Sequence, residues 1–334
     1  MKKEIFGKLN TGENIYKFTL SNGVISLAIL EYGASIQSLK FNGKEMVLGY
    51  DHLEDYIKGT DYFGAIIGRY ANRIDNGHFI LNGREYTLFQ NFGTSSLHGG
   101  KEGFNTKKWQ ACAEEDKLIL YYLSKDGEEG YPGNLDVKVV YSLLEDGVAI
   151  EYQAVSDKDT PINLTNHTYF NLTGGECSIE DYILTLDADS YTPLNEKFVT
   201  TGEICSVDNT PFDFRIPKKI CRDIEKDNEQ LRIAGGYDHN FVLNGKGFRK
   251  FAEIYSETSK TAMNVSTDLI GVQFYTGNLL KDGSTIADHK VIHKRYGLCL
   301  ETQFFPNAVN LPNFPSTILK AGEIYKSRTE YRFK

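Results

Sequence analysis

The chain has 334 residues, of which 40% are hydrophobic and 25% charged, and its formal net charge is −8 at pH 7. This composition supplies enough apolar side chains for one large core, and the acidic balance argues against nucleic acid or anionic lipid as a partner. No apolar run follows Lys2 and Lys3, and no stretch approaches the roughly 18 apolar residues of a membrane helix. We therefore expect a soluble, cytoplasmic protein without membrane association.

Short segments rich in β-branched and aromatic residues recur along the chain, and several alternate polar with apolar side chains. This period of two is typical of strands. The 20 Phe and 21 Tyr residues also favour pleated sheets over helices. The clearest strand patterns are at Val24–Leu30, Lys117–Leu123, Val137–Leu143, Val148–Val155, Tyr182–Ala188 and Thr261–Ser266.

Turn dipeptides separate these segments and predict hairpins. Asn-Gly and Asp-Gly suit type I′ turns, in which both central residues need positive φ. They occur at Asn22-Gly23, Asn42-Gly43, Asn82-Gly83, Asn244-Gly245, Asp126-Gly127, Asp146-Gly147 and Asp282-Gly283. Many short strands joined by hairpins predict an all-β fold, a large antiparallel sandwich or barrel.

Helices are expected to be few and short. The segment Asp51–Lys58 predicts one or two turns with Asp51 as the N-cap. The segment Lys218–Ala234 is charged and lacks an apolar stripe, so it is a short surface helix or a loop that Gly235-Gly236 ends. No low-complexity tract divides the chain, and we predict a single domain over residues 1–334.

The sequence carries no signal for a metal or an organic cofactor. The cysteines lie at positions 112, 177, 205, 221 and 299, an odd number without metal-ligand spacing, and we expect buried free thiols. A phosphate-binding Gly-Lys-Ser/Thr loop, a strand-linked dinucleotide fingerprint and a Gly-x-Ser-x-Gly elbow are all absent.

Two segments place histidine among groups suited to a polar ligand. His98 stands beside Gly99 and Gly100, where backbone can approach a ligand closely, although a turn histidine in solvent fits equally well. In segment 163–171 alternate polar residues share one strand face, which suits the floor of a cleft better than a solvent-facing strand. These residues are Asn163, Thr165, His167, Tyr169 and Asn171.

Three further segments offer acids and hydrogen-bond donors. Glu301 ends an apolar strand, where its proton affinity can be tuned for base catalysis, although surface acids at strand ends are common. Asn72 and Arg73 suit sugar hydroxyls, with an ion-paired arginine as the alternative. Asp238 lies in a tight loop, where it can accept from hydroxyls or simply stabilise a turn.

Taken together, these segments resemble the aldose 1-epimerase (galactose mutarotase) family. No single segment is decisive, but so many in the family's order are highly specific, and they run from about Asn22 to Pro315. The matching segments are Phe63–Ile74, Leu97–Gly100, Gly103-Phe104 with Trp109, Asp126–Gly133, Asn166–Leu172, Tyr237–Phe241, Gln273–Asn278, Glu301–Asn307 and Pro312–Pro315.

The resemblance implies a large antiparallel β-sandwich that interconverts the α and β anomers of free aldohexoses such as galactose and glucose, without a cofactor. By the family pattern, Glu301 is the general base, His167 the general acid, and His98 a second catalytic histidine near the ring oxygen. The residues implied in sugar binding are Asn72, Arg73, His98, Thr168, Tyr169, Asp238 and Gln273. Thr168 stands where serine is common, and Asn307 where aspartate is frequent, which leaves the hydrogen bonding of that loop open.

Three other functions fit parts of this pattern. A hexose-phosphate mutarotase of the same fold needs a phosphate-binding cluster of Arg or Lys, and the matching segments offer only Arg69 and Arg73 for it. A non-catalytic sugar-binding protein would not need an acid, a base and a second histidine. A glycosidase would use a carboxylate pair and release a reducing sugar. No signal in the sequence selects the sugar or the aromatic residue that stacks on it.

Overall fold

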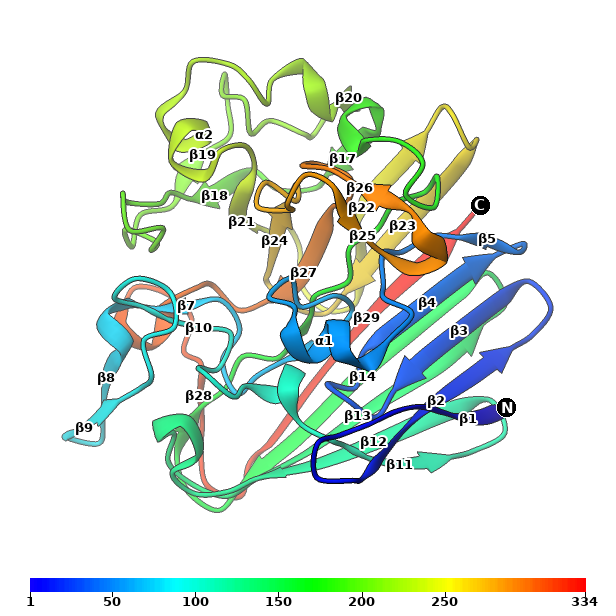
Figure 1. Cartoon of the computed structure of the whole chain (residues 1–334). Helices are drawn as coiled ribbons and strands as arrows, with labels where there is room; N and C mark the ends of the chain where they lie inside the picture. Colours follow the sequence, from blue (N-terminus) through cyan, green and yellow to red (C-terminus); the bar gives the residue numbers. More distant parts are fainter.

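The computed structural model describes residues 1–334 and contains three large antiparallel sheets (Figure 1). The largest has nine strands, in the order β11 (Gln110–Ala113), β12 (Lys117–Ser124), β13 (Leu135–Leu144), β14 (Gly147–Ser156), β29 (Ile324–Phe333), β23 (Thr261–Thr267), β22 (Arg249–Ser256), β17 (Ile183–Leu186) and β20 (Lys218–Lys219).

Two five-stranded sheets accompany it. The N-terminal sheet runs in chain order through β1 (Lys2–Lys8), β2 (Asn14–Ser21), β3 (Ile25–Leu30), β4 (Ile36–Phe41) and β5 (Lys44–Glu45). The other sheet carries candidate site residues, in the order β19 (Cys205–Ser206), β18 (Ser190–Thr192), β21 (Asp238–Val242), β24 (Gly271–Tyr275) and β27 (Cys299–Gln303).

The remaining elements are short. The two-stranded pairs are β6 (Ile66–Ile67) with β16 (Thr165–Asn166), β7 (Arg73–Ile74) with β10 (Ser96–Leu97), β8 (His78–Leu81) with β9 (Arg84–Thr87), β15 (Thr160–Pro161) with β28 (Ile318–Leu319), and β25 (Ser284–Thr285) with β26 (Val291–Ile292). The helices are α1 (Leu53–Lys58) and α2 (Glu229–Ala234), and the 3₁₀ turns are η1 (Asp75–Gly77), η2 (Phe104–Thr106), η3 (Glu128–Gly130), η4 (Ile179–Asp181), η5 (Ile220–Arg222), η6 (Ala287–His289) and η7 (Ala308–Asn310). Neither α-helix is long and apolar enough to cross a membrane.

Both five-stranded sheets pack against the nine-stranded sheet. In Figure 1 the blue strands β2–β4 lie over the green strands β13 and β14, and the Tyr141 hydroxyl of β13 donates to the carbonyl of Ala34 at 2.7 Å. On the same face of the nine-stranded sheet, the Tyr331 hydroxyl of β29 donates to the carbonyl of Leu300 on β27 at 3.2 Å. One core of 55 buried residues drawn from all three sheets fills the space between them. The predicted all-β sandwich is confirmed.

The predicted strands are confirmed to within two residues at each end. Strand β13 shows why the pattern is reliable, because Leu135, Val137 and Val139 are buried while Asp136 and Lys138 between them are not. Successive side chains of a strand point to opposite faces, so this alternation both defines the strand and buries one of its faces.

The predicted turn type holds at two of the seven dipeptides. Asn42-Gly43 and Asn82-Gly83 have positive φ at both central residues, and at four others only the glycine does. The prediction is wrong at residues 146 and 147, because Gly147 already pairs with Leu144 across the β13–β14 hairpin. The buried faces of the two long strands fix this register, and the turn falls on residues 145 and 146.

Both helices lie within the segments predicted for them, but the predicted N-cap of α1 is wrong. Helix α1 begins at Leu53 after His52, which makes no side-chain cap, while Asp51 instead accepts a hydrogen bond from the amide of Asp288 at 2.8 Å. Helix α2 ends at Gly235, whose φ of +67° suits glycine, as predicted.

The expectation of buried thiols holds only for Cys299. All five cysteines are free, Cys112, Cys177 and Cys221 are exposed, and Cys205 is half-buried. Cys112 shows the reason, because it lies on β11 at the edge of the nine-stranded sheet.

Candidate active site

The chemistry-bearing residues converge on one cleft of about 290 Å³. Strands β21, β24 and β27 supply Asp238, Tyr275 and Glu301, while His98 and His167 come from the segments that follow β10 and β16. Sequence positions more than 200 residues apart therefore meet at one surface, and the cleft is the candidate active site.

Glu301 lies on β27, and few neighbouring groups offset the cost of burying its carboxylate. Its side chain is 3% exposed, and its Oε1 lies 3.7 Å from Nε2 of His167. Its Oε2 has no hydrogen-bond partner. Burial raises the pKa of Glu301 well above its ordinary value of 4.5; the charge of Asp238 raises it further, while Arg73 lowers it. A carboxylate with such a pKa is a stronger base than an exposed one.

His167 is held by its backbone beside β6. Its amide donates to the carbonyl of Ala65 at 2.9 Å, and its carbonyl accepts from the amide of Gly64 at 3.0 Å. Burial lowers the pKa of His167 to about 4, an effect that the residue's own carbonyl partly offsets. Its Nδ1 lies 3.5 Å from the sulfur of Cys299. The other ring nitrogen, Nε2, therefore faces Glu301.

His98 forms a reciprocal pair with Asn72. The amide of His98 donates to the carbonyl of Asn72 at 3.1 Å, and the amide of Asn72 donates to Nδ1 of His98 at 3.2 Å. Both residues adopt positive φ, of +53° and +61°. Burial lowers the pKa of His98 well below its ordinary value, and the neighbouring His167 and Arg73 lower it further. The ring is therefore neutral, and since Nδ1 accepts, its proton lies on Nε2.

A network of polar groups surrounds Asp238 at the other end of the cleft. Gln273 donates from Nε2 to Oδ1 of Asp238 at 2.7 Å, and the Arg73 guanidinium lies 3.8 Å from its Oδ2. The same guanidinium stacks over Phe92 at 4.5 Å and near Phe198 at 5.5 Å. Arg73 and Asp238 are thereby fixed in place before any ligand arrives.

Aromatic rings sandwich His167. Tyr62 stacks on one side at a centroid distance of 5.6 Å and Tyr169 packs at 5.0 Å, both at 26° to the imidazole. Tyr62 also contacts His98 edge-on at 4.9 Å, and Tyr275 lies edge-on to His167 at 6.3 Å. These rings exclude water from the imidazoles and give the cleft an apolar surface beside its polar groups.

Most residues predicted for the site line the cleft. They are Asn72, Arg73, His98, His167, Tyr169, Asp238 and Glu301. Gln273 is buried behind Asp238 and reaches the cleft only through it. Thr168 does not line the cleft, because its hydroxyl donates to Oδ1 of Asn166, and it is 1% exposed.

The predicted polar strand face of segment 163–171 is only partly formed. The strand is limited to β16 (Thr165–Asn166), and Asn163 and Asn171 are used to bond backbone elsewhere. Asn163 accepts from the amide of Phe304 at 2.9 Å, and Asn171 donates to the carbonyl of Tyr296 at 2.6 Å. Of the five residues, His167 and Tyr169 reach the cleft.

The loop after Glu301 keeps its hydrogen bonds with Asn307 where aspartate is frequent. Oδ1 of Asn307 accepts from the amide of Asp75 at 3.1 Å and from the side chain of Asn310 at 2.9 Å. A carboxylate oxygen would accept in the same way, so the asparagine serves the same structural purpose.

His98, His167 and Glu301 also form the one trio whose ligand atoms lie close enough for a metal ion, within 4.8 Å of one another. The amide of Asn72 occupies Nδ1 of His98, which leaves the cleft-side nitrogen protonated and without a lone pair for coordination. The donor set therefore suits proton transfer better than metal binding, and the absence of a cofactor stays a prediction.

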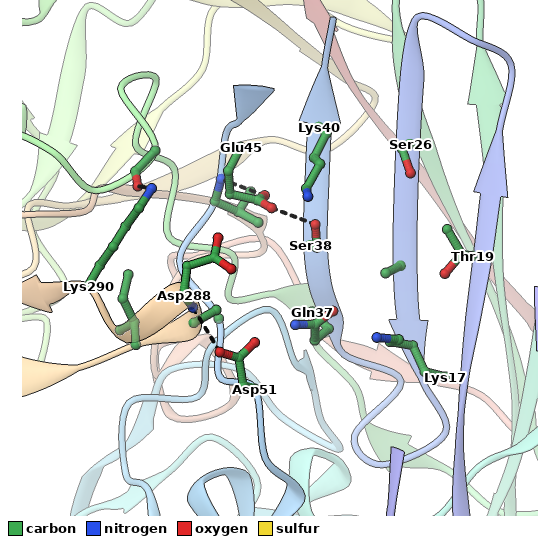
Figure 2. A pocket seen from close by; sticks show the side chains of 16 residues that line it. Lys17, Thr19, Ser26, Gln37, Ser38, Lys40, Glu45, Asp51, Asp288 and Lys290 are labelled. Atoms are coloured by element: carbon green, nitrogen blue, oxygen red, sulfur yellow. Dashed lines mark hydrogen bonds between the residues drawn. The ribbon is translucent and has the colours of Figure 1, made fainter. Parts of the chain in front are cut away.

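A second cleft, of about 250 Å³, lies between β2–β4 and the β25–β26 hairpin (Figure 2). Two of its polar groups bond within the protein: Glu45 accepts from the Ser38 hydroxyl at 2.5 Å, and the Lys290 ammonium donates to the carbonyl of Gly174 at 2.7 Å. No histidine lines it. We assign no chemistry to it.

Gly99 shapes the turn that presents His98. Its φ is +94°, and an added Cβ would lie 1.9 Å from the carbonyl oxygen of Gly68. We expect Gly99→Ala to lower the free energy of unfolding by about 2–5 kcal/mol, which is the sum of the costs of a left-handed backbone and of overpacking. Because His98 moves with the turn, we also expect a lower kcat for the anomer exchange that the sequence predicts. Urea unfolding and turnover measurements check both.

Gly83→Ala is the matched control for this prediction. Gly83 has a similar φ of +75° but nothing within 4 Å of an added Cβ. We expect a loss of about 1–2 kcal/mol and an unchanged kcat. Equal losses of unfolding free energy in the two variants would show that the contact between the added Cβ and the carbonyl of Gly68 has no effect.

Comparisons with known proteins agree with this geometry. The family model described as aldose 1-epimerase matches residues 16–332. The chain is 40% identical to a galactose mutarotase of Bos taurus, covering 99% of this chain and 98% of that protein. It is 37% identical to an aldose 1-epimerase of Escherichia coli (strain K12), over 94% and 93% of the two chains. The crystal structure of a galactose 1-epimerase from Lactobacillus acidophilus superposes with a TM-score of 0.88 at 28% identity, covering 100% of this chain and 98% of that one.

Proposed function

Since the chain belongs to the aldose 1-epimerase family, we propose that it interconverts the α and β anomers of free aldohexoses with Glu301 as base and His167 as acid. The observation that carries the assignment is the distance of 3.7 Å between Oε1 of Glu301 and Nε2 of His167 in a shared buried cleft. The unpartnered Oε2 of Glu301 supports it, because a buried acceptor without a partner is costly unless a ligand satisfies it.

Anomer exchange requires two proton transfers at neighbouring oxygens. Glu301 takes the proton of the C1 hydroxyl while Nε2 of His167 donates one to the ring oxygen, and the C1–O5 bond breaks. The open aldehyde turns about the C1–C2 bond, and the two transfers reverse as the ring closes on the other face. Concerted transfer avoids both an alkoxide and an oxonium ion, and each positioned group typically contributes about 10²–10⁴-fold.

The other cleft residues hold the sugar while C1 turns. Asp238 accepts from hydroxyls, and Asn72 and Arg73 offer amide and guanidinium groups in fixed directions. The Nε2–H group of His98 donates a hydrogen bond to the ring oxygen and stabilises charge that develops there. Tyr62 and Tyr169 are the aromatic rings best placed to pack against the sugar, because both flank the acid.

The pair of Glu301 and His167 must hold one exchangeable proton in total, and ring opening begins with that proton on Nε2 of His167 and with Glu301 as a carboxylate. The pKa of Glu301 is raised and that of His167 is lowered to about 4. Below about pH 4 the pair gains a second proton and no base remains. Above the raised pKa of Glu301 the pair loses its only proton and no acid remains. We expect a bell-shaped dependence of kcat/KM on pH, with an acid limb near pH 4, measured by polarimetry. A flat profile between pH 3 and 10 contradicts this coupling.

Polarimetry also tests the function itself. Crystalline α-D-galactose and α-D-glucose are dissolved with and without the protein, and the relaxation of optical rotation is followed. We expect a faster relaxation with the protein for at least one sugar. An unchanged rate for all aldohexoses would favour a non-catalytic sugar-binding protein.

Two enzymatic alternatives predict other outcomes. A hexose-phosphate mutarotase needs several cations in the cleft, but Arg73 is the only Arg or Lys that lines it. Arg69 points instead to loop carbonyls, donating to Pro132 at 2.7 Å. We therefore expect slower turnover of glucose 6-phosphate than of glucose. A glycosidase would release reducing sugar from a galactoside, and we expect none.

A further inference from the structure

The two cleft histidines differ in what contacts Nδ1, the ring nitrogen away from the reacting groups. At His98 the partner is the backbone amide of Asn72, at 3.2 Å. A backbone amide can only donate, so Nδ1 of His98 is unprotonated and Nε2 permanently carries the proton of the neutral ring. His98 is therefore a fixed hydrogen-bond donor: loss of the Nε2 proton would leave a buried imidazolate anion, and protonation of Nδ1 would break the contact with Asn72.

At His167 the partner is the thiol of Cys299, whose sulfur lies 3.5 Å from Nδ1. No other side chain bonds this nitrogen, and the residue's own backbone carbonyl is a further acceptor for the ring. Cys299 and Glu301 are two residues apart on β27, so both side chains point to the same face of the sheet. Cys299 is fully buried and makes no other hydrogen bond. The same strand thus holds His167 from both sides, with the thiol at Nδ1 and the carboxylate at Nε2.

We propose that Cys299 is a positioning residue for His167, in which the sulfur accepts a hydrogen bond from Nδ1–H and leaves Nε2 as the nitrogen that exchanges protons with the sugar. During turnover Nε2 must both hold and release a proton. If Nδ1 were the unprotonated nitrogen, release from Nε2 would create a buried imidazolate anion. With Nδ1 protonated throughout, the ring alternates between imidazolium and neutral imidazole.

A neutral sulfur suits a proton donor better than a carboxylate in this position. An anionic partner at Nδ1 favours imidazolium and so weakens the ring as an acid. Burial raises the pKa of the Cys299 thiol well above its ordinary value, and Glu301 and Asp238 raise it further. The thiol therefore stays uncharged and orients the ring while leaving the imidazolium a strong acid. The inference rests on the role proposed for His167.

The tautomers are measured directly on protein labelled with ¹⁵N-histidine, whose seven histidines are assigned with single His→Asn variants. We expect the signal of a protonated nitrogen at Nδ1 of His167 and at Nε2 of His98. Cys299→Ala removes the acceptor, and we expect kcat to fall about five- to tenfold, as typical for one lost hydrogen bond, with KM within about twofold. Cys299→Ser keeps an acceptor, and we expect kcat to return to within about twofold of the parent protein.

Cys112→Ala is the control, because Cys112 is an exposed thiol on the edge strand β11. We expect it to change neither kcat nor the histidine signals. An unprotonated Nδ1 in the parent protein overturns the inference, as does an equal loss of kcat in the alanine and serine variants, which would show that the sulfur only fills space. If the alanine variant fails to fold, the ¹⁵N signals of the parent protein and the kcat of Cys299→Ser still test the inference. Polarimetry of the parent protein separates a failure of this inference from a failure of the proposed function.

Discussion

Glu301→Gln is expected to lower kcat by about 10³-fold and to leave the fold intact. The amide has the shape of the carboxylate but cannot take the proton of the C1 hydroxyl, and loss of a positioned base typically costs about 10²–10⁴-fold. The side chain is 3% exposed, and replacing a buried acid by its neutral isostere relieves its desolvation. We therefore expect an unchanged or slightly raised melting temperature alongside the lost activity.

Glu45→Gln is the matched control for this substitution. Glu45 is a half-buried acid whose pKa burial raises, while its bonds to Ser38 and Leu39 lower it, but it lies in the second cleft (Figure 2). We expect kcat to stay within about twofold of the parent protein. Circular dichroism shows whether each variant is folded, and polarimetry gives kcat. Near-full activity of Glu301→Gln would remove Glu301 from the role of base.

The sheets were predictable because their physical cause is local. Side chains of β13 alternate between core and solvent, and the same alternation that buries Val137 and Val139 is visible in the sequence. Segment 163–171 shows the limit of this reasoning. Its alternation continues past Asn166, but the backbone of His167 bonds to Ala65 and Gly64 rather than to a neighbouring strand, and β16 ends after two residues. Tertiary contacts decided that boundary.

Most residues predicted for the site from the sequence line the cleft, whereas two neighbours that pack against His167 could not be predicted. Tyr62 reaches His167 because its loop is anchored by the bond of 2.9 Å between the Tyr50 hydroxyl and Asp61. Cys299 gains its significance from a contact with a residue 132 positions away. Neither residue belongs to a local pattern, since an isolated tyrosine or cysteine has the same appearance in a core or in a site.

His167→Asn is expected to lower kcat by about 10²–10³-fold, because asparagine keeps a polar atom near the position of Nδ1 but has nothing at that of Nε2. Glu301 then keeps its ability to accept from the C1 hydroxyl, but the ring oxygen receives no proton and bond breaking leaves an alkoxide. His98 cannot substitute, because the amide of Asn72 keeps Nδ1 unprotonated, and transfer of the Nε2 proton would leave a buried imidazolate anion. We expect KM to change less than kcat, since Asp238 and Arg73 still hold the sugar, and we expect the acid limb near pH 4 to disappear.

His239→Asn separates this loss from the general effect of removing a buried imidazole. His239 is fully buried, and burial lowers its pKa to about 3, but it lies outside the cleft and contacts Gln230 at 3.3 Å. Its Nδ1 accepts from the amide of Asp238 at 3.2 Å, a bond that the asparagine oxygen can replace. We expect a lower melting temperature and an unchanged kcat for the folded protein. If His167→Asn retains most of its activity, or if the two variants lose activity equally, proton donation by His167 is excluded, and His98 becomes the group to test as the acid.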